Sequence, residues 1–380
     1  MYSVFWLSIV FILYTYILYP LLIFILSKNK IKTHCSQNTA LTAAVVIVVH
    51  NEAHQIEKKI NNIQAQDANL AIKQIIIVSD ASTDQTDVIV KALQKKDPRI
   101  EGYVLSQQSG KAAGINLGMS KVNADIVVFA DARQEFETTA ISNLLCGFAD
   151  ESVAAVAGEL RFREPGEAAH VAQSIGLYWK YETWIRACES DFYSLTGAPG
   201  AIYAIRRDYF VPLPEPLILD DVWIPMHIVL AKKRVIYCPS AIAWDYSQEK
   251  SDKEFKRKVR TLAGNIEFVA LQPKAILPSA NPFWWMFVSH KLFRMVVPYA
   301  FMLALLSNVF ILDSFYAGVL FLQVGFYFLG YLGSLNEAQH AKKSTCKLCT
   351  VIYVFLMMNQ AAVYGLVFYL KGKHNKLWNA

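Results

Sequence analysis

Two kinds of hydrophobic pattern alternate through the middle of the chain. Between short apolar runs, hydrophobic residues recur every three or four positions, as in Ile56, Ile60 and Ile63. The short runs predict strands, and the second pattern predicts helices. Because the two alternate, we expect an α/β fold with a mainly parallel sheet sandwiched by helices. The predicted strands are 43–49, 74–79, 100–105, 126–130 and 153–157.

The first 27 residues contain no charged side chain, and Lys28, Lys30 and Lys32 follow immediately. A helix of this length spans the hydrocarbon core of a bilayer, which is ~30 Å thick. A cleaved signal peptide is the alternative, but no basic residue precedes the apolar run and no small-x-small site ends it. We therefore predict a transmembrane helix over 1–27.

Three more uncharged segments lie near the other end of the chain, at 295–312, 314–336 and 348–370. Each is long enough to cross a membrane. We therefore predict a region of about three transmembrane helices over 295–370, of which the first two form a tight hairpin.

The segment 281–294 precedes these spans and combines Trp284 and Trp285 with Lys291 and Arg294. Aromatic and basic residues on one helix are typical of a helix that lies in the membrane interface. We expect an interfacial helix here.

The lysines after the first span predict that 40–280 is a cytosolic domain, because short loops rich in Lys and Arg stay on the cytosolic side. The same rule makes the loop at 337–347 cytosolic. However, Lys371, Lys373 and Lys376 would lie outside if the last segment crossed the membrane completely. Either the charge rule fails at this tail, or one C-terminal segment is re-entrant or interfacial.

Composition narrows the class of protein. Of the 380 residues, 54% are hydrophobic, which exceeds what a simple soluble enzyme needs. The net charge of +6 comes mainly from the flanking lysines and from the run KEFKRKVR at 253–260. This charge favours an anionic membrane surface or an anionic substrate and makes no specific case for nucleic acid. The six scattered cysteines do not form a zinc-binding pattern, so we expect reduced thiols.

Polar residues interrupt the apolar frame where predicted strands end. Asp80 follows the run IIIVS, and open α/β sheets bind ligands at the carboxyl ends of their strands. Ser82 or Thr83 is expected to cap the next helix, with Asp84 in its first turn. Asp131 follows another strand. An aspartate of this kind can hold a hard divalent cation, and Lys111, in SGKAAGIN, can bind phosphate oxygens.

Together with Asn51-Glu52, SLTGAPGAIYAIRR at 194–207 and LDDVW at 219–223, these motifs resemble those of the family 2 inverting glycosyltransferases of the GT-A fold. The membrane-embedded branch, which includes polysaccharide synthases, is the most similar, and the resemblance covers roughly 42–300. It implies that Glu52 and Asp80 contact the base and ribose of a nucleotide sugar, expected to be a UDP-sugar. It also implies that Lys111 lies near the diphosphate.

The resemblance assigns chemistry to two aspartates. Asp131 matches the first Asp of the DxD motif, which holds Mg²⁺ or Mn²⁺ on the diphosphate. Asp221 matches the general base that deprotonates the acceptor hydroxyl, and such a single displacement inverts the anomeric centre. We expect the neighbouring Asp220 to cap its helix.

The chain departs from the family pattern in two places. Arg133 replaces the second Asp of the DxD motif. The QxxRW motif of processive enzymes falls at 257–261, where only Arg260 is kept and Arg257 and Thr261 replace Gln and Trp. With Gly197, Arg257 and Arg260 mark the expected acceptor or processivity region. The missing Trp weakens the case for a long polymer.

Each motif also has a structural explanation. Asp80 and Asp84 suit a turn and a helix cap, Lys111 suits a solvated loop, and Gly197 and Gly200 suit turns. The aromatic residues at 177–184 suit a core or an interface better than a sugar platform.

The ordered series favours a metal-dependent inverting glycosyltransferase anchored in a bacterial inner membrane with its catalytic domain in the cytosol. It would move a sugar to a glycan or lipid-linked acceptor for surface polysaccharide or glycolipid synthesis. A processive synthase acting with glycan-export partners is an alternative. An inactive nucleotide-sugar-binding scaffold of a glycan-assembly complex is an alternative of another class.

Overall fold

A computed structural model describes residues 1–28, 41–163, 170–246, 251–311, 313–338 and 346–372. Lys30, Lys32, Lys342, Lys343, Lys373 and Lys376, on which part of the expected topology rests, lie outside these ranges. The described residues contain one eight-stranded sheet in the order β3-β2-β1-β4-β7-β6-β8-β5. The strands are β1 (Ala43–Val49), β2 (Ile72–Ser79), β3 (Ile100–Val104), β4 (Ile126–Ala130), β5 (Glu135–Phe136), β6 (Val153–Arg163), β7 (Ile202–Arg206) and β8 (Arg234–Tyr246).

The sheet is mixed. β1 pairs in parallel with β2 and β4, β2 with β3, and β6 with β8. β7 runs antiparallel between β4 and β6, and β5 runs antiparallel to β8. All five predicted strands are present. Strands β5, β7 and β8 were not predicted, because β5 is only two residues long and β7 and β8 lie where the hydrophobic pattern is irregular.

Helices cover both faces of the sheet because β1 buries alternate residues on opposite sides. Ala43, Val45 and Ile47 belong to the core shared with α3, α4 and α6, whereas Val46 and Val48 belong to the core shared with α5 and α8. The helices are α3 (Ile56–Gln64), α4 (Thr86–Lys96), α5 (Lys111–Met119), α6 (Ala140–Cys146), α7 (His170–Phe192), α8 (Asp220–Leu230) and α9 (Ser251–Leu271).

Within the described ranges, four segments are long and apolar enough to cross a membrane, one N-terminal and three C-terminal, as predicted: Tyr2–Ser27, Trp284–Val309, Ser314–Leu335 and Lys347–Leu370. The first contains α1 (Tyr2–Leu13), the π-helix η1 (Tyr14–Leu18) and α2 (Tyr19–Ser27). The second contains α10 (Trp284–Phe287), the π-helix η5 (Val288–Leu292) and α11 (Phe293–Val309). The others are α12 (Ser314–Ala338) and α13 (Lys347–Leu370).

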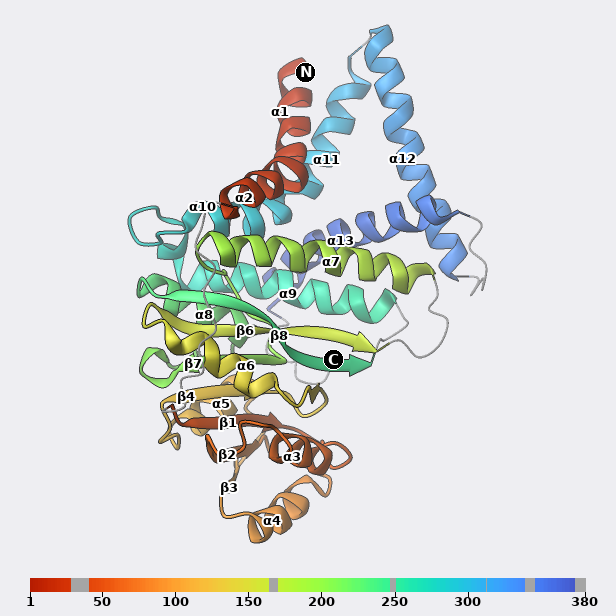
Figure 1. The fold of residues 1–380 in the computed structure, drawn as a ribbon. Coiled ribbons are helices and arrows are strands. Elements are labelled where there is room, and N and C mark those ends of the chain that lie inside the picture. Colours follow the sequence, from red (N-terminus) through yellow and green to blue (C-terminus); the bar gives the residue numbers. More distant parts are fainter. Residues whose placement is uncertain (29–40, 164–169, 247–250, 312, 339–345, 373–380) are drawn as a thin grey trace.

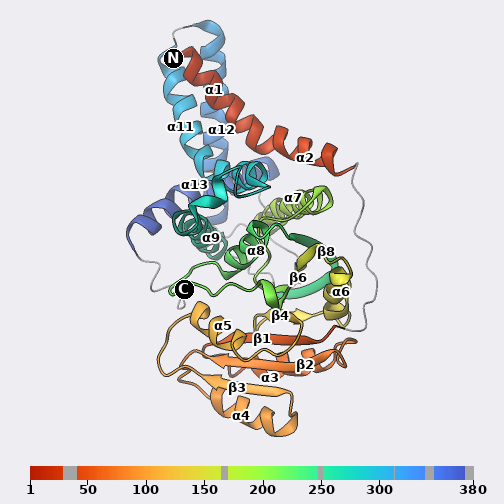
Figure 2. The ribbon, with the colours of Figure 1, turned by 90° about the vertical axis from the view of Figure 1, so that its left-hand side faces the viewer.

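These helices do not all run in the same direction. α1, α11 and α12 extend away from the sheet, and α11 and α12 form the expected hairpin (Figure 1). α13 instead lies across their base and contacts α7 and α9 (Figures 1 and 2). Because Trp284–Val309 is one continuous segment, residues 284–294 lead directly into α11.

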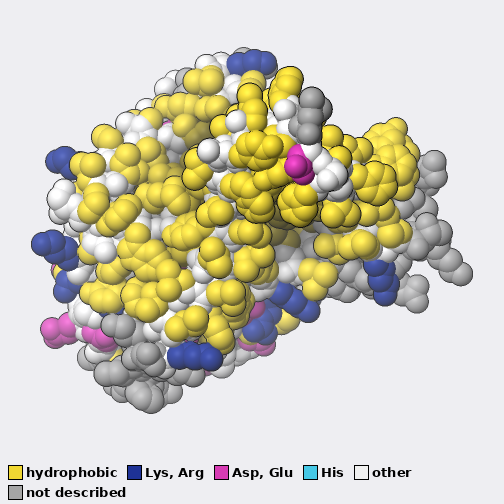
Figure 3. Space-filling view, turned by 90° about the horizontal axis from the view of Figure 1, so that it is seen from above, with side chains coloured by type: hydrophobic (Ala, Val, Ile, Leu, Met, Phe, Trp, Pro, Cys, Tyr) yellow, Lys and Arg dark blue, Asp and Glu magenta, His cyan; other side chains and the backbone are white. Residues whose placement is uncertain are grey.

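The face beyond these helices is covered mainly by apolar side chains, with Lys and Arg near its edges (Figure 3). Large exposed hydrophobic residues on the projecting helices, or directly after α11, include Leu7, Phe310, Phe321 and Leu322. A contiguous apolar surface of this kind is expected of helices that contact lipid.

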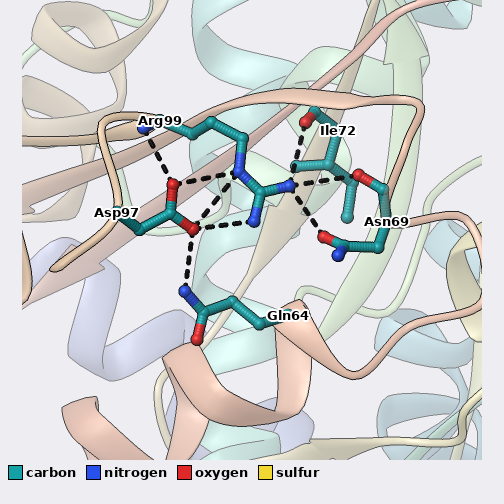
Figure 4. A network of polar contacts seen from close by, with 5 residues as sticks. All are labelled: Gln64, Asn69, Ile72, Asp97 and Arg99. Carbon is teal, nitrogen blue, oxygen red and sulfur yellow. Dashed lines mark hydrogen bonds and ion pairs between the residues drawn. The ribbon is translucent and has the colours of Figure 1, made fainter.

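A polar network ties α3 and β2 to the turn before β3 (Figure 4). Asp97 Oδ2 accepts hydrogen bonds from Arg99 Nη2 at 2.7 Å and from Gln64 Nε2 at 2.8 Å. Arg99 Nη1 donates to Asn69 Oδ1 at 2.7 Å and to the carbonyl of Ile72 at 3.4 Å. Because Arg99 bonds to the carboxylate, the pKa of Asp97 lies well below its ordinary value.

We expect Asp97→Asn to lower the free energy of unfolding by about 2 kcal/mol at neutral pH, since hydrogen bonds to a charged group contribute about 1.5–3 kcal/mol. Because the pKa of Asp97 is lower in the folded state, the ionised carboxylate stabilises the fold above about pH 4. This stabilisation is lost as the pH falls and Asp97 becomes protonated. The variant and the parent should therefore converge at acid pH in unfolding measurements. Glu57→Gln is the control, because its ion pair with Lys96 is exposed and should contribute little. Equal losses in both variants at neutral pH would contradict this account.

Candidate active site

Lys111 lies at the centre of a cluster of three aspartates. It is the first residue of α5, and its Nζ lies 3.1 Å from Asp131 Oδ1 and 3.4 Å from Asp220 Oδ1. Burial alone would lower the pKa of Lys111, but Asp131, Asp220 and Asp221 together hold it above its ordinary value. Lys111 is therefore a charged ammonium group that interacts with carboxylates at the end of β4 and at the start of α8.

Asp80 positions the loop that carries Lys111. Its carboxylate is fully buried and accepts hydrogen bonds from the backbone N–H groups of Ser109 at 2.7 Å and Gly110 at 2.9 Å. Gly110 has φ +90°, a conformation that other residues rarely adopt, immediately before α5 begins. The strand-end aspartate found from the sequence thus contacts the loop before Lys111 directly.

The loop after β2 is also tied to the loop after β1. Asn51 Oδ1 accepts the N–H of Thr83 at 2.7 Å, and the Asn51 N–H donates to Ser82 Oγ at 3.1 Å. Asp84 Oδ1 accepts the N–H of Thr86 at 2.9 Å, where α4 begins. The expected cap by Ser82 or Thr83 is therefore wrong, because the helix starts later and these residues bond to Asn51 instead.

Asp220 was expected to cap α8, but the helix has no side-chain cap. Its carboxylate instead pairs with Lys111 and accepts a hydrogen bond from the Tyr203 hydroxyl at 3.3 Å. Lys111 and Tyr203, on other elements of the site, are therefore its partners in place of the backbone N–H groups of its own helix. Asp220 therefore belongs to the Lys111 cluster. In the sequence, only its position next to Asp221 in LDDVW pointed to such a role.

Asp221 lies beside this pair in a confined place. Its Oδ2 accepts the N–H of Gly200 at 3.1 Å, and a Cβ added at Gly200 would lie 3.0 Å from the same oxygen. Glycine at this position therefore allows the backbone to approach the carboxylate. Burial, together with the charge of Asp220, raises the pKa of Asp221 to about 6. A carboxylate with such a pKa is suited to accept a proton near neutral pH.

Arg133, at the second position of the expected DxD motif, is held by β8. Its Nη2 lies 2.7 Å from Oδ2 of Asp245, which also accepts a hydrogen bond from Gln134 Nε2 at 2.9 Å. The guanidinium is thus neutralised by a buried carboxylate.

The residues present fit a divalent cation only in part. The described residues contain no group of three or more His, Cys, Asp or Glu side chains that could hold a metal ion. Asp131 is one accessible carboxylate, with 38% of its side chain exposed. Mg²⁺ and Mn²⁺ accept one or two carboxylates when phosphate oxygens supply other ligands. The site therefore fits a cation that binds together with a diphosphate.

Glu52 lies at the same end of the sheet. It is half-buried, its N–H donates to Thr86 Oγ1 at 2.9 Å, and its side chain interacts electrostatically with Arg133 and Asp131. Burial raises the pKa of Glu52 above its ordinary value.

The expected acceptor residues divide into two groups. A Cβ at Gly197 would lie 3.5 Å from the carbonyl oxygen of Asp221, and Arg260 Nη2 donates to the carbonyl of Ile218 at 3.5 Å. Both residues therefore lie beside the start of α8. Arg257 contacts a different region, because it pairs with Glu254 and its guanidinium lies 4.6 Å from the Trp179 ring.

Residues 44–211 match the model of the family described as glycosyl transferase family 2. The chain carries a family 2 glycosyltransferase domain. The match begins in β1 and extends past β7, so the glycosyltransferase domain includes Lys111, Asp131 and Gly200. Asp220 and Asp221 follow the end of the matched region.

Two named bacterial proteins illustrate which sequences this glycosyltransferase resembles. It is 24% identical over 303 residues to the probable glycosyltransferase YdaM of Bacillus subtilis (strain 168). The aligned region covers 74% of this chain and 68% of YdaM. It is 25% identical over 231 residues to the poly-beta-1,6-N-acetyl-D-glucosamine synthase of Staphylococcus aureus (strain COL), which covers 58% of this chain. The chain spans 54% of the synthase's own length.

The fold of the glycosyltransferase is similar to that of the mannosyltransferase PcManGT from Pyrobaculum calidifontis, solved in complex with GDP-Man and Mn²⁺. The TM-score is 0.70 at 18% identity, and the similarity covers 97% of this chain and 99% of the other. It therefore includes the apolar helices as well as the sheet. The expected GT-A-type fold with one N-terminal and three C-terminal apolar helices is confirmed.

Proposed function

We propose that this chain is a membrane-bound, metal-dependent inverting glycosyltransferase that transfers a sugar from a nucleotide sugar to a glycan or lipid-linked acceptor. The observation that carries the proposal is the Lys111 ammonium group, which joins Asp131 and Asp220 beside Asp221. This arrangement combines a cation for a departing diphosphate, a carboxylate for a metal and a base for an acceptor.

Asp221 would act as the general base. Its Oδ2 is oriented by the Gly200 N–H, which leaves the other carboxylate oxygen for the acceptor hydroxyl. That oxygen takes the proton while the acceptor oxygen attacks the anomeric carbon. The bond from carbon to diphosphate breaks on the opposite face, and the diphosphate leaves with the electron pair. One displacement of this kind inverts the anomeric configuration.

Lys111 would stabilise the leaving diphosphate. Its charge is fixed by three neighbouring aspartates, so it is present before the reaction and needs no rearrangement as negative charge develops. Asp131 would hold Mg²⁺ or Mn²⁺ together with the diphosphate oxygens, and a bound cation of this kind would add further charge stabilisation. The PcManGT structure, which has a similar fold and was solved with GDP-Man and Mn²⁺, supports the binding of a cation together with a nucleotide sugar.

Glu52 and Asp80 would form the donor side of the site. Asp80 fixes the 109–110 backbone through both carboxylate oxygens, and Glu52 lies within electrostatic reach of Asp131. We propose that they position the base and ribose of the nucleotide. A UDP-sugar remains the proposed donor, although the structural relative was solved with GDP-Man.

The test is turnover of donor by the purified full-length protein in detergent, with a panel of UDP- and GDP-sugars and with Mg²⁺ or Mn²⁺. We expect one donor to release nucleoside diphosphate and product mass to increase by one sugar when a lipid extract is added. An inactive scaffold would bind a nucleotide sugar without releasing nucleoside diphosphate from any donor. A processive synthase would give products of many lengths.

We propose that the sheet domain lies in the cytosol of a bacterium and that the helices enter the inner membrane. The structure places Met1 and the turn between α11 and α12 at the ends of the helices far from the sheet (Figure 1). A cysteine introduced at Glu151 should therefore react with an impermeant thiol reagent only after the cells are opened.

A cysteine introduced at Asp313 should react in intact cells, because this residue lies in the distant turn. Both variants would be made in a background without exposed native cysteines. Labelling of Glu151→Cys in intact cells would contradict the topology and the use of a cytosolic donor.

A further inference from the structure

Four basic side chains come from elements between the catalytic domain and the apolar helices, and among them Lys291 interacts electrostatically with Arg186 and Lys258. Arg186 comes from α7, Lys258 and Arg260 come from α9, and Lys291 comes from η5. All four are half-buried. Both α7 and α9 lie between the sheet and α13, so the cluster stands at the level where the domain meets the apolar helices (Figures 1 and 2).

The cluster borders the proposed base. A Cβ at Gly197 would lie 3.9 Å from Lys291 Nζ and 3.5 Å from the carbonyl of Asp221. The Arg260 guanidinium reaches the carbonyl of Ile218, just before α8. Asp221 interacts electrostatically with Arg260 and Lys291 of the cluster. It also interacts with Lys111, which comes from α5. Asp221 is thus shared by the Lys111 site and a second set of cations.

These cations make no direct ion pair with a carboxylate in the part of the chain that the structure describes. No ion pair joins any of the four to an Asp or Glu there, and the Nε of Arg260 is buried without a hydrogen-bond partner. Lys258 Nζ instead lies 4.5 Å from the centre of the Tyr178 ring. The two glutamates that act electrostatically on Lys258 and Lys291 already have partners: Glu254 pairs with Arg257, and Glu189 bonds to His290 and Tyr19.

Like charges held together in a partly buried place repel one another, and an anion removes that cost. Burial is the main cause that lowers the pKa of Lys258 to about 7, and the guanidinium groups of Arg257 and Arg186 act in the same direction against the attraction of Glu254. The group that belongs between these side chains is therefore negatively charged, and phosphate is the anion that several Lys and Arg donors bind best.

We propose that this cluster binds the phosphate of a lipid-linked acceptor. The inference rests on the proposed function and gives its acceptor a chemical class, a saccharide carried on a lipid phosphate or diphosphate. The lipid chain would lie among the apolar helices, and the phosphate would be held by Lys258, Arg260 and Lys291. The saccharide hydroxyl would then face Asp221, which takes its proton as the new glycosidic bond forms and the donor diphosphate leaves.

Binding of farnesyl phosphate to the full-length protein in detergent tests the proposal. The comparison probes are farnesol and inorganic phosphate, and EDTA removes metal-dependent binding at the Lys111 site. We expect farnesyl phosphate to bind at least tenfold more tightly than either comparison probe. Loss of a hydrogen bond between charged groups should make binding to Lys258→Gln or Lys291→Gln about tenfold to a hundredfold weaker.

Lys256→Gln is the matched control, because Lys256 is an exposed lysine on the same helix, and its affinity should equal that of the parent. Lys258→Arg keeps the charge and should retain binding. Equal affinity for farnesol and farnesyl phosphate would overturn the proposal, as would unchanged binding in both glutamine variants. Equal binding of inorganic phosphate would overturn the lipid assignment. None of these results depends on donor turnover, so the inference and the proposed function fail separately.

Discussion

Replacement of Asp221 by Asn should lower kcat about 10²- to 10⁴-fold, the usual contribution of a general base. Asn keeps the size of the side chain and can still accept the Gly200 N–H, but it cannot take a proton. Nucleotide-sugar affinity should change little. Single-turnover kinetics and calorimetry with the donor measure the two effects separately.

The pH dependence gives a second view of the same residue. Because burial raises the pKa of Asp221 to about 6, the base is ionised above that pH and protonated below it. We therefore expect kcat/KM to fall as the pH drops through about 6, and we expect this limb of the profile to be absent from the residual activity of Asp221→Asn.

Asp220→Asn is the matched control. The change removes one of two carboxylate partners of Lys111 while Asp131 remains, so it should lower kcat less than Asp221→Asn does. An inactive Asp220→Asn with an active Asp221→Asn would show that the base is Asp220. Loss of donor binding in both variants would make the pair a nucleotide or metal site.

The second large effect is expected at Asp131. Asp131→Ala should abolish metal-dependent turnover while the protein still folds, because a bound cation contributes several kcal/mol of charge stabilisation. Mn²⁺ binding followed by electron paramagnetic resonance gives a readout apart from activity. In the parent, Mn²⁺ should bind tightly only with a nucleoside diphosphate, since Asp131 alone supplies few ligands.

Asp125→Ala serves as the control, because this exposed aspartate precedes the same strand at its other end and bonds to Thr42. It should leave turnover and Mn²⁺ binding unchanged. Full turnover of the parent in excess EDTA would contradict the assignment of a metal to Asp131.

Much of the fold was predictable because the spacing of hydrophobic residues within each short segment indicates its secondary structure. The run 43–49 alternates between two cores, and the apolar segments at both ends are long and uncharged. Strands β7 and β8 were missed, since their pairing is settled by neighbours distant in the sequence. The sequence also did not predict that α13 lies across the base of the other apolar helices, because its packing on α7 and α9 depends on the shape of the whole domain.

The site was predictable as a list of residues but not as a set of contacts. The sequence indicated Lys111, Asp131 and Asp221 separately. It assigned Asp220 to a helix cap, whereas the structure pairs Asp220 with Lys111 across the site. It treated Gly200 as a turn residue and gave no role to Asp245, which neutralises Arg133. Contacts between residues more than 20 positions apart, such as these, are set by tertiary packing.

The anomeric configuration of the product tests the central claim most directly. Nuclear magnetic resonance of the sugar transferred from an α-linked donor reports whether the new bond is α or β. A single displacement with Asp221 as base predicts a β-linked product. An α-linked product would contradict in-line attack by an acceptor that Asp221 deprotonates.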